Sequence, residues 1–344
     1  MNQLAPRPVD RARVRLAAAW CRSNLPGKTF VAQRFARVDD DQFGQGAGET
    51  EFTDRWGQHR LRVDPEEYFQ RWAWLLGRYH EWPLQLLMSK ALRPGDTFVD
   101  IGANLGLVAL RAAGLVGAGG VVRAFEPNPE VYPRLEWHVT RNALNHVKTS
   151  VLALGKQCGL ATLRLNSVNT GTGSLADLPW TRDGGRDHVC TVERADAALA
   201  DLPDRPTMIK IDVEGFECEV LLGMNRLIRR HRPLLVCEVN IGCLKAAGSG
   251  LRRLLLMTEQ WGFKAFLFHA AWSLWSASRL KLEPLSMPPS SLFDLVFLHP
   301  QGPHWARLNG YVSVRSHAGS RGQVGRSPAL RGPAAGVQHP PTRA

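Results

Sequence analysis

Short apolar segments alternate with helical segments from about residue 96 to residue 300, and this alternation restricts the fold more than any other feature of the chain. Strands joined by helices of ~10–15 residues predict βαβ units and a parallel sheet covered by helices on both faces. The strand segments lack polar alternation, which is typical of strands buried on both sides. They are 97–104, 121–127, 147–155, 207–215, 232–240, 263–268 and 293–300.

Outside this pattern, the chain predicts an N-terminal extension over residues 1–85. The extension opens with a basic segment, then has a short hairpin at 51–63 around Trp56 and Gly57, and then an aromatic helical stretch at 68–92. Along that stretch the apolar spacing predicts a buried face. We expect this face to contain Trp72, Trp74, Leu75 and Leu76.

After Pro300 the sequence becomes rich in Gly, Ser, Pro, Arg and Ala. A segment of this composition buries too little apolar surface to offset the entropy of ordering it. We therefore predict a disordered basic tail over residues 301–344.

The formal net charge of +12 lies in the two ends of the chain. Asp10 is the only acid among residues 1–37, and no acid follows residue 299, so the part between them is nearly neutral. Basic ends favour solubility or weak attraction to anionic surfaces, and they say little about a catalytic pocket. The charge therefore does not by itself predict specific binding of nucleic acid.

The six cysteines form no CxxC pair and no metal-ligand spacing, and several lie in apolar runs, where a free Cys is a small core residue. No stretch reaches the ~18 consecutive apolar residues that span a bilayer. The apolar run near the N-terminus is shorter than the core of a secretory signal, which needs ~7–15 residues. We therefore expect a cytoplasmic protein without a membrane span.

A glycine turn at the end of the first predicted sheet strand is the sharpest local signal. Asp100 precedes Gly102, Asn104 and Gly106 at a strand-to-helix junction. Glycines there permit a tight turn and close approach of a ligand, and the carboxyl ends of strands are where ligands bind in such sheets. Asp100 would repel a pyrophosphate but suits the ammonium group of a methionine moiety. The turn thus favours S-adenosylmethionine, which carries no phosphate.

A second acid follows the next strand. Glu126 can accept hydrogen bonds from both hydroxyls of a ribose, which indicates a nucleoside without identifying it. Asn128 shapes the turn that follows Glu126. We also place Leu154 and Asn142 near the adenine.

The motifs DIGANLG at 100–106, FEPNP at 125–129 and IKIDVEGFE at 209–217 resemble, in this order, the FkbM-type family of class I S-adenosylmethionine-dependent methyltransferases. The resemblance runs from about residue 77 to about residue 300. It implies a doubly wound, Rossmann-like α/β sheet of seven strands and a methyltransferase domain over 86–300. It also implies S-adenosyl-L-methionine as cofactor and O-methylation of a hydroxyl on a sugar, glycan or polyketide-type small molecule.

Carried over by position, the resemblance assigns residues to two groups. The cofactor contacts would be Asp100, Gly102, Asn104, Gly106 and Glu126. The end of the KIDVEG strand and the acid of the following strand would be Lys210, Asp212, Glu214, Gly215 and Glu238.

The chemistry expected at KIDVEG is proton removal from the acceptor hydroxyl. Asp212 and Glu214 alternate with Val213, so on a strand they point to one face, and two adjacent carboxylates raise each other's pKa. Lys210 has the same parity and could position them. We assign all three to catalysis. Asp212, Glu214 and Glu238 could instead hold a divalent cation, but nothing in their spacing demands it, and we predict no metal site.

Residues on the acceptor side are less sharply defined. Glu238, at the end of the strand after KIDVEG, lies on the same edge of the predicted sheet. His80 and Glu81 precede the first sheet strand and could line the entrance. Ser174 ends the loop 169–174, whose glycines fit either a mobile lid or a plain surface turn.

Two other enzyme classes fit the sequence less well. A NAD(P)-dependent oxidoreductase would need the motif GxGxxG, which is missing. The carboxylate of Asp100 would also repel the phosphates of its cofactor. A nucleic-acid methyltransferase would account for the basic ends, but the KIDVEG strand ends in DVEG instead of the Asn/Asp-Pro-Pro-aromatic motif that holds a flipped base. A non-catalytic interaction protein would need none of Asp100, Glu126 and Asp212.

Overall fold

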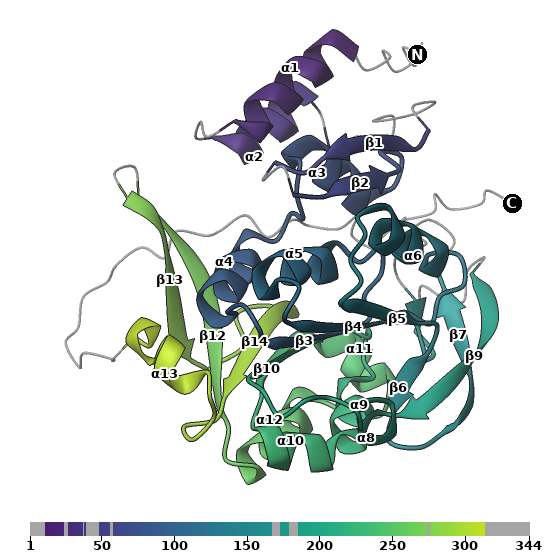
Figure 1. Ribbon diagram of the computed structural model, residues 1–344, viewed down its shortest axis with the longest axis vertical. Coiled ribbons are helices and arrows are strands. Elements are labelled where there is room, and N and C mark those ends of the chain that lie inside the picture. Colours follow the sequence, from purple (N-terminus) through teal and green to yellow (C-terminus); the bar gives the residue numbers. More distant parts are fainter. Residues whose placement is uncertain are drawn as a thin grey trace, which may run out of the picture.

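The computed structural model describes residues 11–23, 27–36, 38, 48–55, 58–166, 173–178, 185–273 and 276–313. Its centre is an eight-stranded sheet (Figure 1). In spatial order the strands are β13 (Ser276–Pro284), β12 (Lys264–Ser273), β14 (Leu292–Leu298), β11 (Leu234–Asn240), β10 (Thr207–Ile211), β3 (Thr97–Ile101), β4 (Val121–Phe125) and β5 (Val147–Ser150).

The predicted doubly wound α/β fold is confirmed. The five strands from β11 to β5 run parallel, and β14 inserts antiparallel between β11 and β12. Adjacent residues of β3 pack into different cores, because Phe98 faces one hydrophobic cluster and Val99 faces the other. The sheet is therefore buried on both faces, as the unbroken apolar strand segments predict.

Helices form the two outer layers. α4 (Trp82–Ala91) and α5 (Leu107–Val116) contribute to the first core, while α9 (Glu217–Gly223) and α10 (Asn225–His231) contribute to the second. The remaining helices of these layers are α6 (Tyr132–Arg141), α8 (Ala195–Ala198), α11 (Ile241–Ala246) and α12 (Leu251–Gln260). No helix within the described residues is both long and apolar enough to cross a bilayer.

The sheet has one strand more than the seven that the family resemblance implies. β13 pairs antiparallel with β12 at the edge of the sheet. Its Leu280 and Leu282 are buried, while Arg279 and Lys281, which alternate with them, are exposed. This alternation is typical of an edge strand with one covered face, so the continuous apolar runs that mark the inner strands do not reveal it.

A second, four-stranded sheet occupies the segment between β5 and β10, where the sequence shows only a polar, Gly-rich passage. Its order is β6 (Ala153–Gly155), β9 (Arg186–Arg194), β7 (Gly159–Leu165) and β8 (Gly173–Ser174). The predicted single strand 147–155 is thus two strands in two different sheets.

The N-terminal extension contains the predicted hairpin, formed by β1 (Thr50–Thr53) and β2 (Arg60–Val63). Trp56 and Gly57, around which we placed it, lie outside the described residues. The aromatic stretch forms two helices, because α3 (Tyr68–Leu76) ends at Gly77 with a left-handed φ of 65° and α4 follows.

The buried face expected on α3 is largely present. Trp72, Leu75 and Leu76 are buried, and Trp74 is partly buried. They pack against α1 (Arg11–Arg22), α2 (Lys28–Val31) and the short π-helical turn η1 (Ala32–Ala36). The predicted boundary after residue 85 falls inside α4, since Leu84 and Leu87 both belong to the first core.

The prediction that the tail is disordered from residue 301 is wrong for residues 301–313. α13 (Trp305–Leu308) and the 3₁₀ turn η2 (Asn309–Tyr311) lie against the first core, and Leu308 is fully buried. The Arg307 guanidinium pairs with the buried Asp96. The buried Leu308 and the ion pair of Arg307 are too few contacts to give a periodic sequence signal. Residues 314–344 lie outside the described residues.

Candidate cofactor and acceptor site

The glycine turn after β3 is held against the end of β10. Gly102 has φ 82°, and a Cβ there would lie 1.8 Å from the carbonyl oxygen of Asp212. Gly106 has φ 80° and precedes α5, and its Cβ would lie 2.3 Å from Cδ1 of Leu135. Glycine is therefore needed at both positions, once to admit the β10 loop and once to admit α6.

Glu126 connects the end of β4 to this turn. Its Oε2 accepts a hydrogen bond from the backbone N–H of Asn104 at 2.7 Å, and its Oε1 accepts one from the N–H of Asn128 at 2.8 Å. Burial raises the pKa of Glu126 to about 7. Each carboxylate oxygen can accept a second hydrogen bond, so the group can still bind the hydroxyls of a ribose.

Asn104 and Asn128 stabilise the two turns as side chains and as backbone donors. Asn104 has a positive φ of 50°, and its Oδ1 accepts from the N–H of Leu105 at 2.7 Å. Asn128 is buried, and its Oδ1 accepts from the N–H of Glu130 at 2.9 Å. Asparagine tolerates this left-handed conformation better than most residues, which accounts for Asn104 in the turn.

Asp100 is a buried carboxyl group beside Lys210, its register partner on the neighbouring strand. Its exposed fraction is 0%, and neither Oδ1 nor Oδ2 has a hydrogen-bond partner in the described part of the chain. Burial raises its pKa to about 7. Lys210 and the backbone of Ala109 favour the charged form of Asp100 but do not outweigh its burial, and a buried carboxylate is costly unless a further cation binds beside it. The site therefore fits a ligand with an ammonium group at this point.

Lys210 lies between the two acids of the neighbouring strand ends. On adjacent parallel strands it is the register partner of Asp100, and its Nζ donates to Oδ2 of Asp212 at 2.7 Å. Burial alone would lower the pKa of Lys210, but Asp212, Asp100 and Glu81 outweigh it and raise that pKa above its ordinary value. Lys210 is therefore a fixed buried cation that positions Asp212.

The expectation that Asp212 and Glu214 alternate along a strand is wrong, because β10 ends at Ile211. Glu214 has a positive φ of 49° and Gly215 one of 106°, so the chain turns here. A Cβ at Gly215 would lie 2.5 Å from the carbonyl oxygen of Cys243. Burial and the charge of Asp212 still raise the pKa of Glu214 to about 7. The loop, instead of strand parity, brings these two carboxyl groups close enough to interact.

Ser174 and Cys243 hold the backbone and side chain of Glu214. The Oγ of Ser174 donates to the carbonyl oxygen of Glu214 at 2.7 Å and accepts from the N–H of Ala176. The Sγ of Cys243 donates to Oε2 of Glu214 at 3.2 Å. Ser174 is buried and occupied in these bonds, and residues 169–172 of the suggested lid lie outside the described residues.

Further acids converge on the same edge of the sheet. Glu238 on β11 is the register partner of Asp294 on β14. The charge of Asp212 and burial raise the pKa of Glu238 well above its ordinary value, and burial together with Glu81 does the same for Asp294. Sequence reasoning named Glu81 only as a neighbour of His80 at the entrance and missed Asp294. The signal for Asp294 was a charged residue inside an apolar strand segment.

His80 lies beside this acidic group and is neutral near pH 7. Its Nε2 is 4.0 Å from Oε1 of Glu81, and its ring packs near those of Tyr79 and Phe69. Burial, Arg78 and Lys210 lower the pKa of His80 to about 4. It therefore adds no positive charge to the site near neutral pH.

Two residues that we placed near the adenine have structural roles. Leu154 on β6 is buried in the second core together with Phe125. The amide of Asn142 binds the backbone N–H and carbonyl of Arg60 in β2, which ties α6 to the hairpin. Among the residues described, no group of three or more His, Cys, Asp or Glu is arranged to hold a metal ion.

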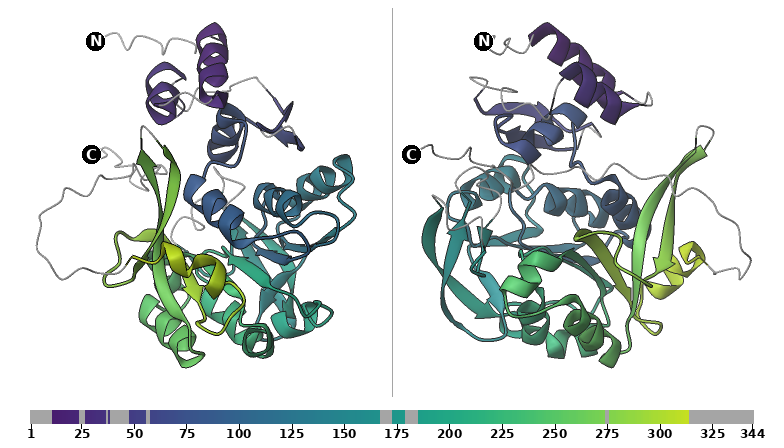
Figure 2. Two further views of the ribbon diagram at one scale, coloured as in Figure 1. Left: turned by 60° about the vertical axis from the view of Figure 1, so that its left-hand side comes forward. Right: turned by 180° about the vertical axis from the view of Figure 1, so that it is seen from behind.

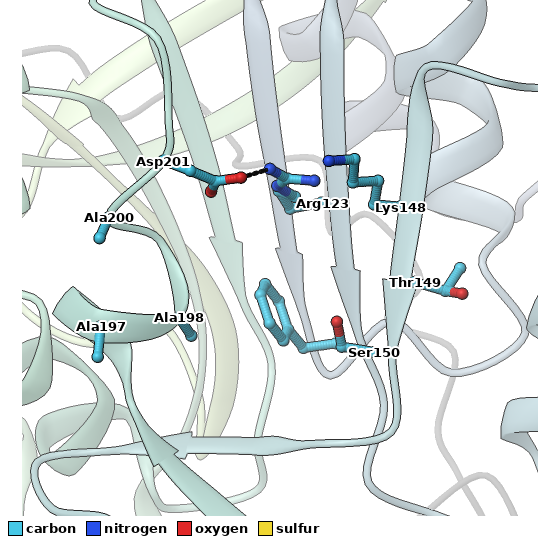
Figure 3. A pocket seen from close by; sticks show the side chains of 9 residues that line it. Arg123, Lys148, Thr149, Ser150, Ala197, Ala198, Ala200 and Asp201 are labelled. Carbon is cyan, nitrogen blue, oxygen red and sulfur yellow. Dashed lines mark hydrogen bonds and ion pairs between the residues drawn. The ribbon is translucent and has the colours of Figure 1, made fainter.

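A pocket of about 360 Å³ lies on the face of β4 and β5, beside α8 (Figure 3). Arg123 and Lys148 line it as register partners on the two strands, and Arg123 pairs with Asp201. None of the predicted site residues lines this pocket. Its lining reaches Phe125 and Ser150 at the ends of β4 and β5, next to Glu126 in the chain.

Comparison with known proteins finds a similar domain family. Residues 100–264 match the model of the methyltransferase FkbM domain. This segment is similar to FkbM methyltransferase domains. The match contains Asp100, Glu126, Lys210 and Asp212, whereas Glu81, His80 and Asp294 lie outside it.

Relatives of the FkbM domain cover the chain in part. The hexuronic acid methyltransferase AglP of Haloferax volcanii is 28% identical over 166 residues, which are 46% of this chain and 62% of that protein. The chain thus spans less than two thirds of that relative's length.

Among solved structures, the FkbM methyltransferase of Methylobacillus flagellatus KT has 15% identity and a TM-score of 0.37, with 85% of this chain and 60% of that chain covered. An S-adenosylmethionine-dependent O-methyltransferase of Thermotoga maritima has 14% identity and a TM-score of 0.34, with 64% and 65% covered.

Proposed function

We propose that this chain is an S-adenosyl-L-methionine-dependent methyltransferase that methylates a hydroxyl group of a sugar, glycan or polyketide-type small molecule. One observation carries the proposal. Inside the FkbM domain, the buried carboxylate of Asp100 has no hydrogen-bond partner among the described residues and lies next to the Gly102 turn. The neighbouring cation Lys210 donates to Asp212, so Asp100 remains available to a cationic ligand, and S-adenosylmethionine carries an ammonium group.

The residues of this chain fit that cofactor in two places. Asp100 would hold the ammonium, and Glu126 would accept hydrogen bonds from the ribose hydroxyls. Gly102, Asn104 and Gly106 keep the turn open between them. Bound there, the cofactor would supply an activated methyl group, and the protein's part is to orient the acceptor and to handle its proton.

Asp212 is the group we propose for proton removal. It is partly exposed, with a side-chain exposed fraction of 24%, while Lys210, which donates to its Oδ2, has 5%. Lys210 holds one oxygen in place, so the other is available to the acceptor hydroxyl. Glu214 lies on the same loop and its raised pKa of about 7 suits the exchange of a proton near neutral pH.

The acceptor class rests on the relatives. AglP is by name a hexuronic acid methyltransferase, so a hydroxyl of a sugar is the first class to try. Glu238, Asp294 and Glu81 provide acceptors for hydroxyl hydrogen bonds on the same side as Asp212. Carboxyl groups are well suited to bind the several hydroxyls of a sugar.

Calorimetric titration of the full chain tests the proposal directly. S-adenosylmethionine and S-adenosylhomocysteine should both bind, and NADH should not. An Asp100→Asn variant keeps the shape and removes the charge, so it should lose affinity for both sulfur compounds. Binding of NADH instead would reverse the assignment in favour of an oxidoreductase. Absence of any binding by a folded sample would reject the cofactor site.

A further inference from the structure

The N-terminal helices have an inner and an outer surface of different character. Ala17, Ala18 and Cys21 of α1 are buried against Trp72 and other residues of α3. On the outer surface, Leu16 of α1 is 73% exposed and Phe30 of α2 is 63% exposed. The helices are therefore anchored to the protein by one surface and present large apolar groups to solvent on the other.

Aromatic side chains gather in this part of the molecule. The exposed tryptophan and phenylalanine residues of the described chain, Trp20, Phe30, Phe35 and Phe69, all precede residue 70. The rings of Phe30 and Phe35 contact each other edge to face with centroids 6.1 Å apart. Exposed groups of this size cost free energy in water, and a contiguous set of them is typical of an interaction surface.

The charge of the same segment has one sign. No Asp or Glu lies between Arg11 and Val38. Arg22 and Lys28 are bonded inward to backbone carbonyls, whereas Arg13, Arg15 and Arg34 are exposed. We call the exposed set Arg13, Arg15, Leu16, Phe30, Arg34 and Phe35 the basic-aromatic surface.

The basic-aromatic surface is accessible to a planar partner. In Figures 1 and 2, α1 and α2 lie at one end of the molecule, beyond α3 and the hairpin of β1 and β2. The helices α10 and α12 lie at the opposite end of the molecule (Figure 1). A flat layer could therefore contact the N-terminal helices without covering the sheet domain.

We propose that the basic-aromatic surface binds the interface of an anionic lipid bilayer, with the N-terminal helices lying on the membrane. Transfer of leucine and phenylalanine side chains to the boundary between headgroups and acyl chains is favourable. Arginine is attracted electrostatically to anionic headgroups. Nucleic acid would use the arginines and stack on the phenylalanines, but it offers nothing to Leu16, the most exposed of the large apolar groups in this segment. The charge and the aliphatic group together favour lipid.

Sedimentation of the full chain with vesicles tests the proposal. One set of vesicles is phosphatidylcholine alone, and the other is an equimolar mixture with phosphatidylglycerol. The chain should sediment with the mixed vesicles, less so at high ionic strength, and much less with phosphatidylcholine. The double variant Leu16→Ser and Phe30→Ser should lower the partition coefficient about tenfold or more.

The matched control is Leu160→Ser with Val189→Ser, which removes two apolar groups of similar exposure, 75% and 74%, from the four-stranded sheet. A second variant reverses charge through Arg13→Glu and Arg15→Glu, compared with Arg252→Glu and Arg279→Glu at exposed positions elsewhere. Only the N-terminal variants should lose binding to the mixed vesicles.

Three results would overturn the proposal. They are equal sedimentation of the N-terminal and control variants, binding that ignores phosphatidylglycerol, and tight binding of polyuridylic acid that the N-terminal variants abolish in the absence of any lipid binding. Melting temperatures of all variants show that each is folded before its partition is compared.

Discussion

The carboxylate of Glu126 accepts a hydrogen bond from the backbone N–H of Asn104 at 2.7 Å, and this bond joins the end of β4 to the glycine turn after β3. A second bond, from the N–H of Asn128, fixes the other oxygen. The carboxylate of Glu126 is therefore held in one orientation at the proposed ribose site. Its contribution to binding and its contribution to the turn can be separated by substitution.

Glu126→Gln should weaken binding of S-adenosylhomocysteine by ~1.5–3 kcal/mol, the usual range for a hydrogen bond to a charged group. The amide keeps one acceptor and replaces the other with a donor, so one backbone N–H and one ribose hydroxyl lose their partner. Titration calorimetry measures the loss. Glu136→Gln, on the exposed side of α6, is the control. Unchanged affinity in a folded Glu126 variant would contradict the ribose role.

Cofactor affinity should rise with pH through about 7. Burial raises the pKa of Asp100 from 3.8 and that of Glu126 from 4.5 to about 7. The ammonium of the ligand favours ionised Asp100, so binding at pH about 6 must release a proton and is weakened. Titrations in buffers of different ionisation enthalpy count the protons. The pH dependence should be smaller in Asp100→Asn, and its persistence there would place the titrating group elsewhere.

The same two acids give the free protein an opposite trend in stability. Their folded pKa values lie above their unfolded values, so the folded state binds more protons between pH of about 4 and 7. Stability should therefore fall as pH rises through this interval. Urea unfolding at a series of pH values measures it, and saturating S-adenosylhomocysteine should reduce the fall. An increase of stability across the interval would contradict the buried, partnerless state of Asp100.

Asp212→Asn should lower turnover by ~10²–10⁴, the usual contribution of a general base, and should leave cofactor affinity nearly unchanged. The substitution keeps the side-chain shape and the contact with Lys210. Initial rates with a methyl acceptor and calorimetry with S-adenosylhomocysteine give the two quantities. Asp187→Asn, at an exposed position of β9, is the control. Loss of cofactor binding would assign Asp212 to the cofactor, and normal turnover would remove it from catalysis.

Lys210→Met should lower the free energy of unfolding by ~3–5 kcal/mol, as expected when one partner of a buried ion pair is removed. Asp212, Asp100 and Glu81 would then surround a site without a cation. Lys156→Met breaks a more exposed pair with Glu219 and should cost less than ~1 kcal/mol. Urea unfolding compares the two. Similar effects in both variants would show that Lys210 is not the structural centre of the acidic group.

Truncation after Pro300 should destabilise the protein by several kcal/mol relative to truncation after Ser313. The shorter chain loses the fully buried Leu308 and the ion pair of Arg307 with Asp96. Removal of a buried leucine side chain alone costs ~2–5 kcal/mol. From composition, we expect truncation after Ser313 to leave stability unchanged. Equal melting temperatures for the two truncated chains would contradict the packing role of α13.

The sequence predicted the part of the fold that depends on local pattern. Apolar strand segments and intervening helices determine the order of the parallel strands and the position of Asp100 and Glu126 at their ends. It could not predict β13, whose half-covered face alternates like any surface strand, or the short strand β8, whose two residues, Gly173 and Ser174, carry no strand signal.

The site was predictable where a single short motif determines the local backbone conformation. The DIGANLG turn needs only the strand end and two glycines. Asp212 and Glu214 were predicted as a pair on one strand, but β10 ends at Ile211, and the turn at Gly215 depends on a distant contact with Cys243. Glu81 and Asp294 come from opposite ends of the domain, and no spacing rule brings them together.

The contact between Gly102 and the carbonyl oxygen of Asp212 has a consequence for how such an enzyme can change. The space that a Cβ would need at residue 102 is filled by the backbone of the loop that carries the proposed base. A recombination experiment that exchanges the 212–215 loop for that of a relative with another acceptor must therefore import a matching 100–106 turn. Libraries that diversify either segment alone will be depleted in functional members, because the backbones of the two segments must fit each other.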